Sequence, residues 1–163
     1  MSHSYAVRLA KERFAFSAAH FITYNGDVCE RLHGHNYRVA AEARGPLDEN
    51  QYVIDFIAFR DCLSTITGQL DHHVLLPTLH PLIRVAADDT AVDVRFRERQ
   101  WVFPRGDCIL LPVANTTAEL LARYIGERLL DALAEKTGVR PRWLRVEVDE
   151  CEGQWAVCEF DSA

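Results

Sequence analysis

Residues 29–44 read CERLHGHNYRVAAEAR, and they join a loop of reactive side chains to a regular strand. From His35 onward, apolar and polar residues alternate with a period of two, which is typical of a half-buried strand. One face would carry Tyr37, Val39, Ala41 and Ala43, and the other Arg38, Glu42 and Arg44. Gly45-Pro46 predicts the end of this strand, and the turn-forming residues of 22–34 predict a loop before it.

Three further strands and two helices are expected around this central strand. Residues 5–20 alternate loosely and predict one long strand that ends in FSAAH. Apolar residues at three- and four-residue spacing predict a first helix from Asp55 to Leu70. A second helix is expected to begin with a capping box from Thr116 to Glu119. Two closing strands are expected at about 142–150 and 154–160, so the order of elements indicates an α+β fold with an antiparallel sheet.

The segment between the two helices, residues 77–114, is expected to be an extra hairpin-like insertion. Its predicted strands, 92–103 and 108–111, would be joined by a turn at 104–107. Three arginines alternate on the first of these strands, at positions 95, 97 and 99. They would project from one face, either as a row that binds a triphosphate or as a solvated edge that discourages strand pairing. Without repeats or flexible linkers, residues 1–163 are expected to form a single domain.

Composition narrows the class of protein. The chain has 163 residues, of which 48% are hydrophobic and 26% charged, and a formal net charge of -6. This balance is typical of a soluble globular protein, and the negative charge argues against nucleic acid as the main partner. No apolar run is long enough for a membrane helix, and the first residues lack the apolar core of a secretory signal. We therefore expect a cytoplasmic protein with no membrane or nucleic-acid partner.

Three histidines form the candidate metal site. His33 and His35 are two residues apart at the start of a strand, so both rings point to the same face. His20 ends the preceding strand, and all three rings converge if these strands pair. Three neutral imidazoles with a fourth position open are typical of catalytic zinc. The alternative is that the histidines are ordinary surface or core residues.

Cys29 lies four residues before His33, in the loop that joins the two ligand strands. A thiol near a cation has a lowered pKa and can act as a thiolate base. The remaining four cysteines are interpreted as inert thiols, because an odd number of cysteines without a CxxC pair favours a reducing compartment.

Five segments, in the correct order, resemble motifs of the 6-pyruvoyl-tetrahydropterin synthase and 6-carboxy-tetrahydropterin synthase family. They cover CERLHGH, FSAAH, Leu70-Asp71-His72, the helix start NTTAE at 115–119, and Glu150. The resemblance implies a tunnelling fold, in which a four-stranded antiparallel sheet carries two helices. It also implies a homo-oligomer, a trimer or hexamer, with active sites at subunit interfaces.

The resemblance also implies residue roles. His20, His33 and His35 would bind Zn2+, and Cys29 would be the catalytic base. Asp71 and His72 would form a proton relay, although a helix cap and an imidazole at the helix dipole are the simpler interpretation of that pair. Glu150 would bind the pterin, with Thr117 and Glu30 as further substrate-binding candidates.

The substrate implied is 7,8-dihydroneopterin triphosphate, a small pterin, and several outcomes stay open. We favour a lyase that forms 6-carboxy-5,6,7,8-tetrahydropterin, a precursor of queuosine. The alternative enzyme is 6-pyruvoyl-tetrahydropterin synthase, which eliminates triphosphate. Glu30 beside Cys29 suggests additional release of 6-hydroxymethyl-dihydropterin, unless Glu30 is only a solvated loop carboxylate. A non-catalytic zinc- or pterin-binding homologue is the alternative from another class.

Overall fold

The long strand β5 (His33–Gly45) organises the main sheet in the computed structural model, which describes residues 3–161. Its first half pairs with β2 (Ala15–His20) and its second half with β1 (Tyr5–Leu9). The expectation of one strand over 5–20 is therefore wrong. The chain turns after β1, where the amide of Phe14 donates to the carbonyl of Lys11, and Phe14 is fully buried in the core. This turn contains neither Gly nor Pro, the usual signals in a sequence.

The main sheet is larger than expected and is mixed. It has seven strands in the order β10-β6-β2-β5-β11-β12, with β1 also paired to β5, so the expected four-stranded antiparallel sheet is too small. The added strands β6 (His73–Pro77) and β10 (Cys108–Leu111) pair in parallel with each other, and β6 also pairs in parallel with β2. Between β2 and β6 the chain passes through β5 and the first helix, the long crossover that parallel neighbours require.

The closing strands agree with the prediction to within one residue. They are β11 (Trp143–Cys151) and β12 (Gln154–Asp161), and β11 pairs with β5 on the side away from β2. The register shifts between Asp149 and Cys151, which marks a bulge at the end of β11. Bulges re-aim side chains locally, and Glu150 lies at this one.

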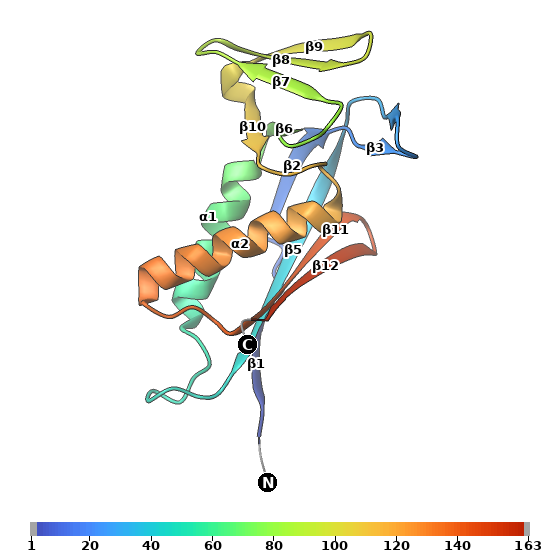
Figure 1. Cartoon of the computed structure of the whole chain (residues 1–163). Helices are drawn as coiled ribbons and strands as arrows, with labels where there is room; N and C mark the ends of the chain where they lie inside the picture. Colours follow the sequence, from blue (N-terminus) through green and yellow to red (C-terminus); the bar gives the residue numbers. More distant parts are fainter. Residues whose placement is uncertain (1–2, 162–163) are drawn as a thin grey trace.

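Two helices cover one face of the main sheet (Figure 1). Helix α1 (Phe56–Leu70) begins as predicted, because the Asp55 carboxylate accepts hydrogen bonds from the amides of Ile57 and Ala58. Helix α2 (Ala118–Thr137) begins after Thr117, whose side chain makes no capping bond. The predicted capping box from Thr116 is wrong, because Thr116 is fully buried and its hydroxyl donates to the carbonyl of Phe21.

The main core lies between the helices and the sheet. Alternation along β5 directs Tyr37, Val39 and Ala41 into it, as the sequence predicts. The helices contribute a stripe of fully buried side chains, Phe59, Leu63, Leu121, Ile125 and Leu129. The same face of β2 and β5 also carries the three histidines, so the core and the candidate site share one side of the sheet. No helix in the described part of the chain is long and apolar enough to cross a membrane.

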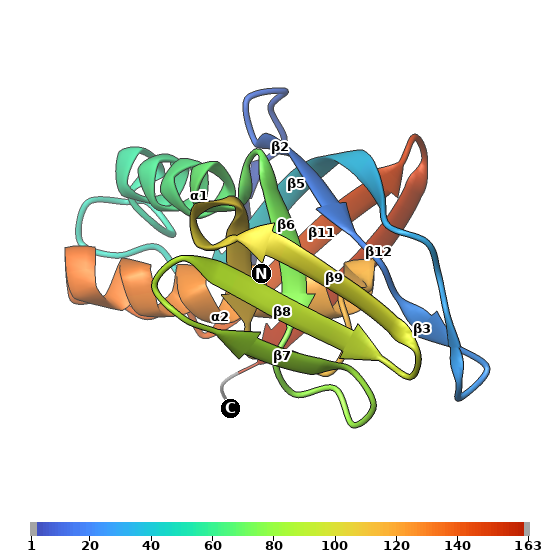
Figure 2. The ribbon, with the colours of Figure 1, turned by 90° about the horizontal axis from the view of Figure 1, so that it is seen from above.

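The 77–114 segment forms a small three-stranded antiparallel sheet at one end of the molecule, seen face-on in Figure 2. Its strands are β7 (Arg84–Ala87), β8 (Ala91–Phe96) and β9 (Arg99–Pro104). The expected turn at 104–107 is wrong. The chain reverses at Arg97-Glu98, with Arg97 in the left-handed region (φ 53°). Residues Arg105–Asp107 instead form a 3-10 turn that leads into β10 of the main sheet.

The predicted arginine row on one strand does not exist. Because of the reversal, Arg95 lies on β8, Arg97 in the turn and Arg99 on β9. Each has its own partner: Arg95 binds Asp93, Arg97 binds Asp27, and Arg99 binds the carbonyl of Cys29. The three side chains therefore cannot act as one phosphate-binding row.

Candidate metal centre

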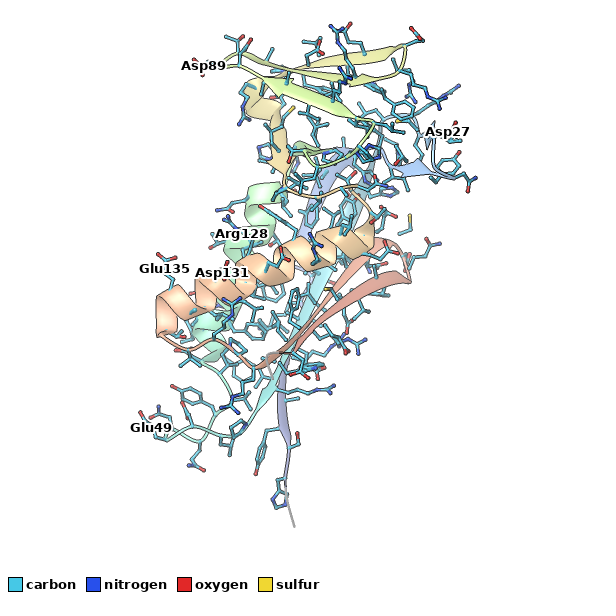
Figure 3. All side chains as sticks on the ribbon, viewed as in Figure 1. Asp27, Glu49, Asp89, Arg128, Asp131 and Glu135 are labelled. Carbon is cyan, nitrogen blue, oxygen red and sulfur yellow. The ribbon has the colours of Figure 1, made fainter. Side chains whose placement is uncertain are left out.

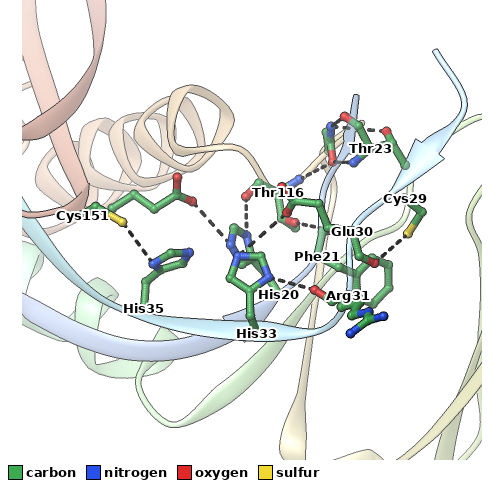
Figure 4. A network of polar contacts seen from close by, with 12 residues as sticks. His20, Phe21, Thr23, Cys29, Glu30, Arg31, His33, His35, Thr116 and Cys151 are labelled. Atoms are coloured by element: carbon green, nitrogen blue, oxygen red, sulfur yellow. Dashed lines mark hydrogen bonds and ion pairs between the residues drawn. The ribbon is translucent and has the colours of Figure 1, made fainter. Parts of the chain in front are cut away.

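Strand register brings the three histidine rings together (Figure 4). His20 on β2 is directly opposite His33 on β5, and Ala18 is opposite His35, so the alternation places all three rings on the same face. Ring centroids are 4.8 Å apart for His20 and His33, 5.2 Å for His20 and His35, and 4.8 Å for His33 and His35. One ligand nitrogen from each ring lies within 4.8 Å of the others, so the cluster could hold a metal ion.

Each ring has a second contact that orients it. His20 Nδ1 lies 2.8 Å from the carbonyl oxygen of Thr116, and His33 Nδ1 lies 2.8 Å from that of Arg31. His35 Nδ1 lies 3.5 Å from Cys151 Sγ. Because a carbonyl oxygen can only accept, Nδ1 of His20 and of His33 carries the hydrogen and Nε2 keeps its lone pair. Such outer contacts fix the tautomer of metal-ligating histidines.

His20 gives the clearest test of whether a metal fits. Its side chain is buried, and its Nε2 has no hydrogen-bond partner among residues 3–161. Glu150 Oε1 lies 3.4 Å from this nitrogen, which meets the distance for an ion pair but not the geometry of a hydrogen bond. A neutral His20 makes no ion pair with Glu150, so its Nε2 lone pair stays unused. A buried, unpaired lone pair facing two other imidazoles fits a metal ligand.

Burial keeps His20 neutral. Desolvation lowers the pKa of His20 to about 4, with the other two histidines acting in the same direction and the Thr116 carbonyl opposing them. At neutral pH the ring is therefore neutral, with Nε2 free, which is the form that binds metal.

Glu150 and Tyr37 form the edge of the cluster toward β11. The hydroxyl of Tyr37 donates to Glu150 Oε1 at 3.4 Å, and the Tyr37 ring lies edge-on to His20 and His35. Burial, and then the Glu150 charge, raise the pKa of Tyr37 well above its ordinary value. Sequence reasoning placed Tyr37 on this face only as a core residue. Its position two residues after His35 was the signal that it also borders the site.

Cys29 lies outside the histidine cluster, on the short strand β4 (Val28–Cys29), which pairs with β3 (Thr23–Tyr24). Its half-buried thiol contacts the carbonyl of Glu30 at 3.5 Å. Burial raises the pKa of this thiol, while the Arg99 charge lowers it and the Glu30 charge raises it. The Glu30 carboxylate extends toward the cluster, with Oε2 3.8 Å from His33 Nε2.

Asp71 and His72 form a pair, but within one chain they do not join the cluster. Asp71 follows α1, and its carboxylate accepts from the Ser17 amide at 2.7 Å and lies 2.8 Å from His72 Nδ1. The first of these contacts is the main cause of the lowered pKa of Asp71. Ser17 alternates with His20 along β2, so its side chain lies on the opposite face of the sheet.

The His72 side chain is 82% exposed and lines a surface hollow of about 440 Å³ together with Ser17, Asn36 and the strand segment that carries His35. This hollow is on the open face of β2 and β5. The hydroxyl of Ser17 donates to Asn36 there, across the sheet from the histidine rings. The structure therefore leaves His72 accessible at the surface.

The remaining predicted residue, Thr117, is at the start of α2, directly after the Thr116 carbonyl that binds His20. Two contacts were missed by sequence reasoning, the Thr116 carbonyl and the Cys151 thiol. Cys151 follows Glu150 directly, but a bulge decides where its side chain points, and nothing in the residue pattern shows the bulge.

Fold and cluster together define an α+β protein with a three-histidine centre of the kind that enzymes use to hold a metal. The chain belongs to the 6-pyruvoyl tetrahydropterin synthase family, whose sequence model matches residues 9–161. Proteins of this family act on small-molecule pterins.

Relatives and solved structures agree with this assignment. A Methanocaldococcus jannaschii protein named "Putative 6-carboxy-5,6,7,8-tetrahydropterin synthase" is 31% identical over 142 residues, which is 86% of each chain. A Pyrococcus abyssi protein of the same name is 32% identical over 136 residues, 83% of this chain and 79% of the relative. The structure of a Plasmodium vivax 6-pyruvoyltetrahydropterin synthase, with a catalytic glutamate replaced by alanine, has a TM-score of 0.88 at 26% identity and covers 98% of this chain and 99% of its own.

Proposed function

We propose that the chain is a zinc-dependent lyase that converts 7,8-dihydroneopterin triphosphate to 6-carboxy-5,6,7,8-tetrahydropterin, a precursor of queuosine. The names of the relatives support this product, and family membership supports a pterin substrate. The observation that carries the proposal is the convergence of three imidazoles on one face, with the buried Nε2 of His20 left unpaired within the described part of the chain.

Zinc suits this donor set. Three neutral imidazole nitrogens, with no fourth ligand in the cluster from the residues that the structure describes, match the composition of catalytic zinc sites, in which one position stays open. A zinc ion held by His20, His33 and His35 would polarise oxygens of the substrate side chain and lower the pKa of the protons beside them.

Cys29 is the base in this proposal, and it removes a proton from the substrate side chain. Glu150 accepts hydrogen bonds from the pterin, because adjacent N–H donors on the ring match the two oxygens of a carboxylate. The Tyr37 hydroxyl supports that role, since it already donates to Glu150 Oε1 and limits how the carboxylate can turn. Thr117 and Glu30 are further substrate contacts.

Asp71 and His72 act as a proton relay between copies of the chain. His72 is exposed on the open face of the sheet, whereas the histidine cluster lies on the other face. A relay from one chain therefore fits a site on a neighbouring chain. We propose a homo-oligomer, a trimer or hexamer, with interfacial active sites.

Glu30 favours a second candidate function, the release of 6-hydroxymethyl-dihydropterin. Its carboxylate lies 3.8 Å from His33 Nε2, so it borders the cluster, as Glu150 does at His20. In the Plasmodium vivax relative, a glutamate is named as a catalytic residue. A chain with both Cys29 and Glu30 would then have two candidate bases for different proton transfers. Triphosphate elimination to the 6-pyruvoyl product is the alternative to carboxy-product formation as the main reaction.

Product analysis tests the proposal. The purified zinc-loaded protein is incubated with 7,8-dihydroneopterin triphosphate, and the pterins are separated by mass into carboxy, pyruvoyl and hydroxymethyl products. A dominant carboxy product supports the proposal, and a dominant pyruvoyl or hydroxymethyl product replaces it with the corresponding alternative. Zinc binding without loss of substrate would instead identify a non-catalytic homologue.

A further inference from the structure

The 77–114 segment packs directly against the loop that carries Cys29. A second hydrophobic cluster, separate from the main core, lies beneath the small sheet and contains Phe21, Leu76, Ile83, Val92, Val94, Phe96 and Cys108. Cys29 and Trp101 are partly buried against this cluster. The environment of the Cys29 thiol is therefore built by the 77–114 segment rather than by the two helices.

Arg99 connects the 77–114 segment to the loop that carries Cys29 through a stack of planar groups. Its guanidinium lies over the Trp101 ring, 4.6 Å from the centroid, and Trp101 is stacked on Phe21 with centroids 4.6 Å apart. From this position Arg99 Nη1 donates to the carbonyl oxygen of Cys29 at 2.7 Å. Phe21 directly follows His20, so the stack links the end of the ligand strand β2 to the backbone of Cys29.

The Cys29 loop needs such support. Strands β3 and β4 have two residues each, and a ladder this short is marginal by itself. Thr23 on β3 is bonded to the side chains of Asn115 and His80. Nearer to β4, Arg97 pairs with Asp27 at 2.7 Å, and Figure 3 labels Asp27 at the end of the molecule where the small sheet lies. Both partners of that pair are well exposed, so it contributes little. The contact from Arg99 is partly buried and is stacked on an aromatic ring, which restricts its geometry.

We propose that Arg99 is a positioning residue that holds the Cys29 loop beside the histidine centre and keeps a positive charge near the thiol. This inference rests on the proposed function in one respect, the assignment of Cys29 as the base. Among residues 3–161, the charges that act on the thiol are those of Arg99, which contacts the Cys29 carbonyl, and of the neighbouring Glu30. Burial and the Glu30 charge raise the pKa of Cys29, and the Arg99 charge lowers it. Arg99 thus favours the thiolate form that a base requires.

The test is the rate at which Cys29 reacts with iodoacetamide across a pH series, followed by mass spectrometry of the modified peptides. Arg99→Gln removes the charge and keeps a hydrogen-bond donor. The matched control is Arg95→Gln, which removes one positive charge from the same small sheet, where Arg95 binds Asp93. The exposed thiol of Cys151 serves as an internal reference in every sample.

In Arg99→Gln, we expect Cys29 to react at least about threefold more slowly at neutral pH, with its pH midpoint moved upward, because a nearby positive charge no longer favours the thiolate. Arg95→Gln should react like the wild type. Arg99→Lys keeps the charge and should return the midpoint close to the wild-type value. The same midpoint in Arg99→Gln and Arg95→Gln, or equal shifts in Arg99→Gln and Arg99→Lys, would overturn the inference.

These rates are measured without any pterin, so they are independent of turnover. A shifted midpoint in a protein that does not consume the substrate would contradict the lyase function and leave the role of Arg99 intact. Turnover in the wild type, with an unshifted midpoint in Arg99→Gln, would contradict only the role of Arg99.

Discussion

The Nδ1 atom of His20 lies 2.8 Å from the carbonyl oxygen of Thr116, a residue 96 positions later in the chain. This contact joins the end of β2 to the start of α2 and leaves Nε2 as the only nitrogen of His20 with a free lone pair. The hydroxyl of Thr116 donates to Phe21, the residue after His20, so Thr116 holds this end of β2 at two points. His20, one ligand of the candidate metal centre, is thereby oriented by the segment that leads into α2.

Burial of His20 predicts a stability loss in acid for the metal-free protein. The pKa of His20 is about 4 in the folded chain and about 6.5 in the unfolded chain, so the unfolded chain binds more protons between these values. The contribution of His20 is complete above pH 6.5 and is lost as the pH falls toward 4. We therefore expect titration of His20 to lower the free energy of unfolding by about 2 kcal/mol between pH 7 and pH 5.

Urea unfolding at the two pH values measures this effect as the difference between the wild type and His20→Gln. His3→Gln is the control, because His3 is exposed near the N-terminus. Equal pH dependence in the wild type and His20→Gln would show that His20 is not held neutral by burial.

Cys151 is predicted to support metal binding through His35. Its Sγ lies 3.5 Å from His35 Nδ1, and loss of such an outer contact weakens metal affinity, here by about threefold to tenfold because water can reach this exposed site. Competition with a coloured chelator gives the zinc affinity of Cys151→Ala. Cys151→Ser keeps a polar partner for the ring and should be less affected. Unchanged affinity in Cys151→Ala would remove Cys151 from the site.

Tyr37→Phe is predicted to raise KM for the pterin more than it lowers kcat. The substitution removes the hydroxyl that donates to Glu150 Oε1 and leaves the carboxylate free to turn. Loss of this hydrogen bond should also cost about 1 kcal/mol of stability. Tyr24→Phe is a matched control, because Tyr24 is exposed on β3. If the two variants have the same KM, the Tyr37 hydroxyl does not orient a pterin-binding group.

Cys29 and Glu30 are predicted to have separable roles. Cys29→Ala should retain zinc, because the thiol lies outside the histidine cluster, and should lose most formation of the carboxy product. Glu30→Gln should retain that product and lose any hydroxymethyl product. Steady-state rates with separation of the products by mass measure both. A wild-type rate of carboxy-product formation in Cys29→Ala would exclude the thiol as the base. Cys158→Ala is the control, because it removes a half-buried thiol elsewhere in the chain.

Local signals in the sequence predicted the helices, the closing strands and the convergence of the histidines. Apolar spacing predicts α1 to within one residue of its observed start at Phe56, and the period of two along β5 places His33 and His35 on one face. These features depend on residues that are close together in the chain. Convergence of these two rings with His20 requires only that β2 pair with β5, and the turn-forming residues of 22–34 predict the loop that joins these strands.

Features that depend on distant contacts could not be predicted in this way. The strand predicted at 108–111 is confirmed as β10, but its parallel pairing with β6 joins residues more than 30 positions apart, and no local pattern indicates it. Arg97 takes a left-handed conformation in a reversal without Gly, so the alternating arginines were misread as one strand. Thr116 has the residue type of a helix cap, but its burial beneath Phe21 gives its hydroxyl another acceptor.

The zinc content of His33→Ala after dialysis tests the metal centre most directly. His33 contributes one of three ligand nitrogens, and its Nδ1 is committed to the carbonyl of Arg31. We predict about one zinc per chain in the wild type and in His3→Gln, and a strong loss of zinc in His33→Ala. A full complement of zinc in dialysed His33→Ala would contradict the assignment of the three histidines as the metal site.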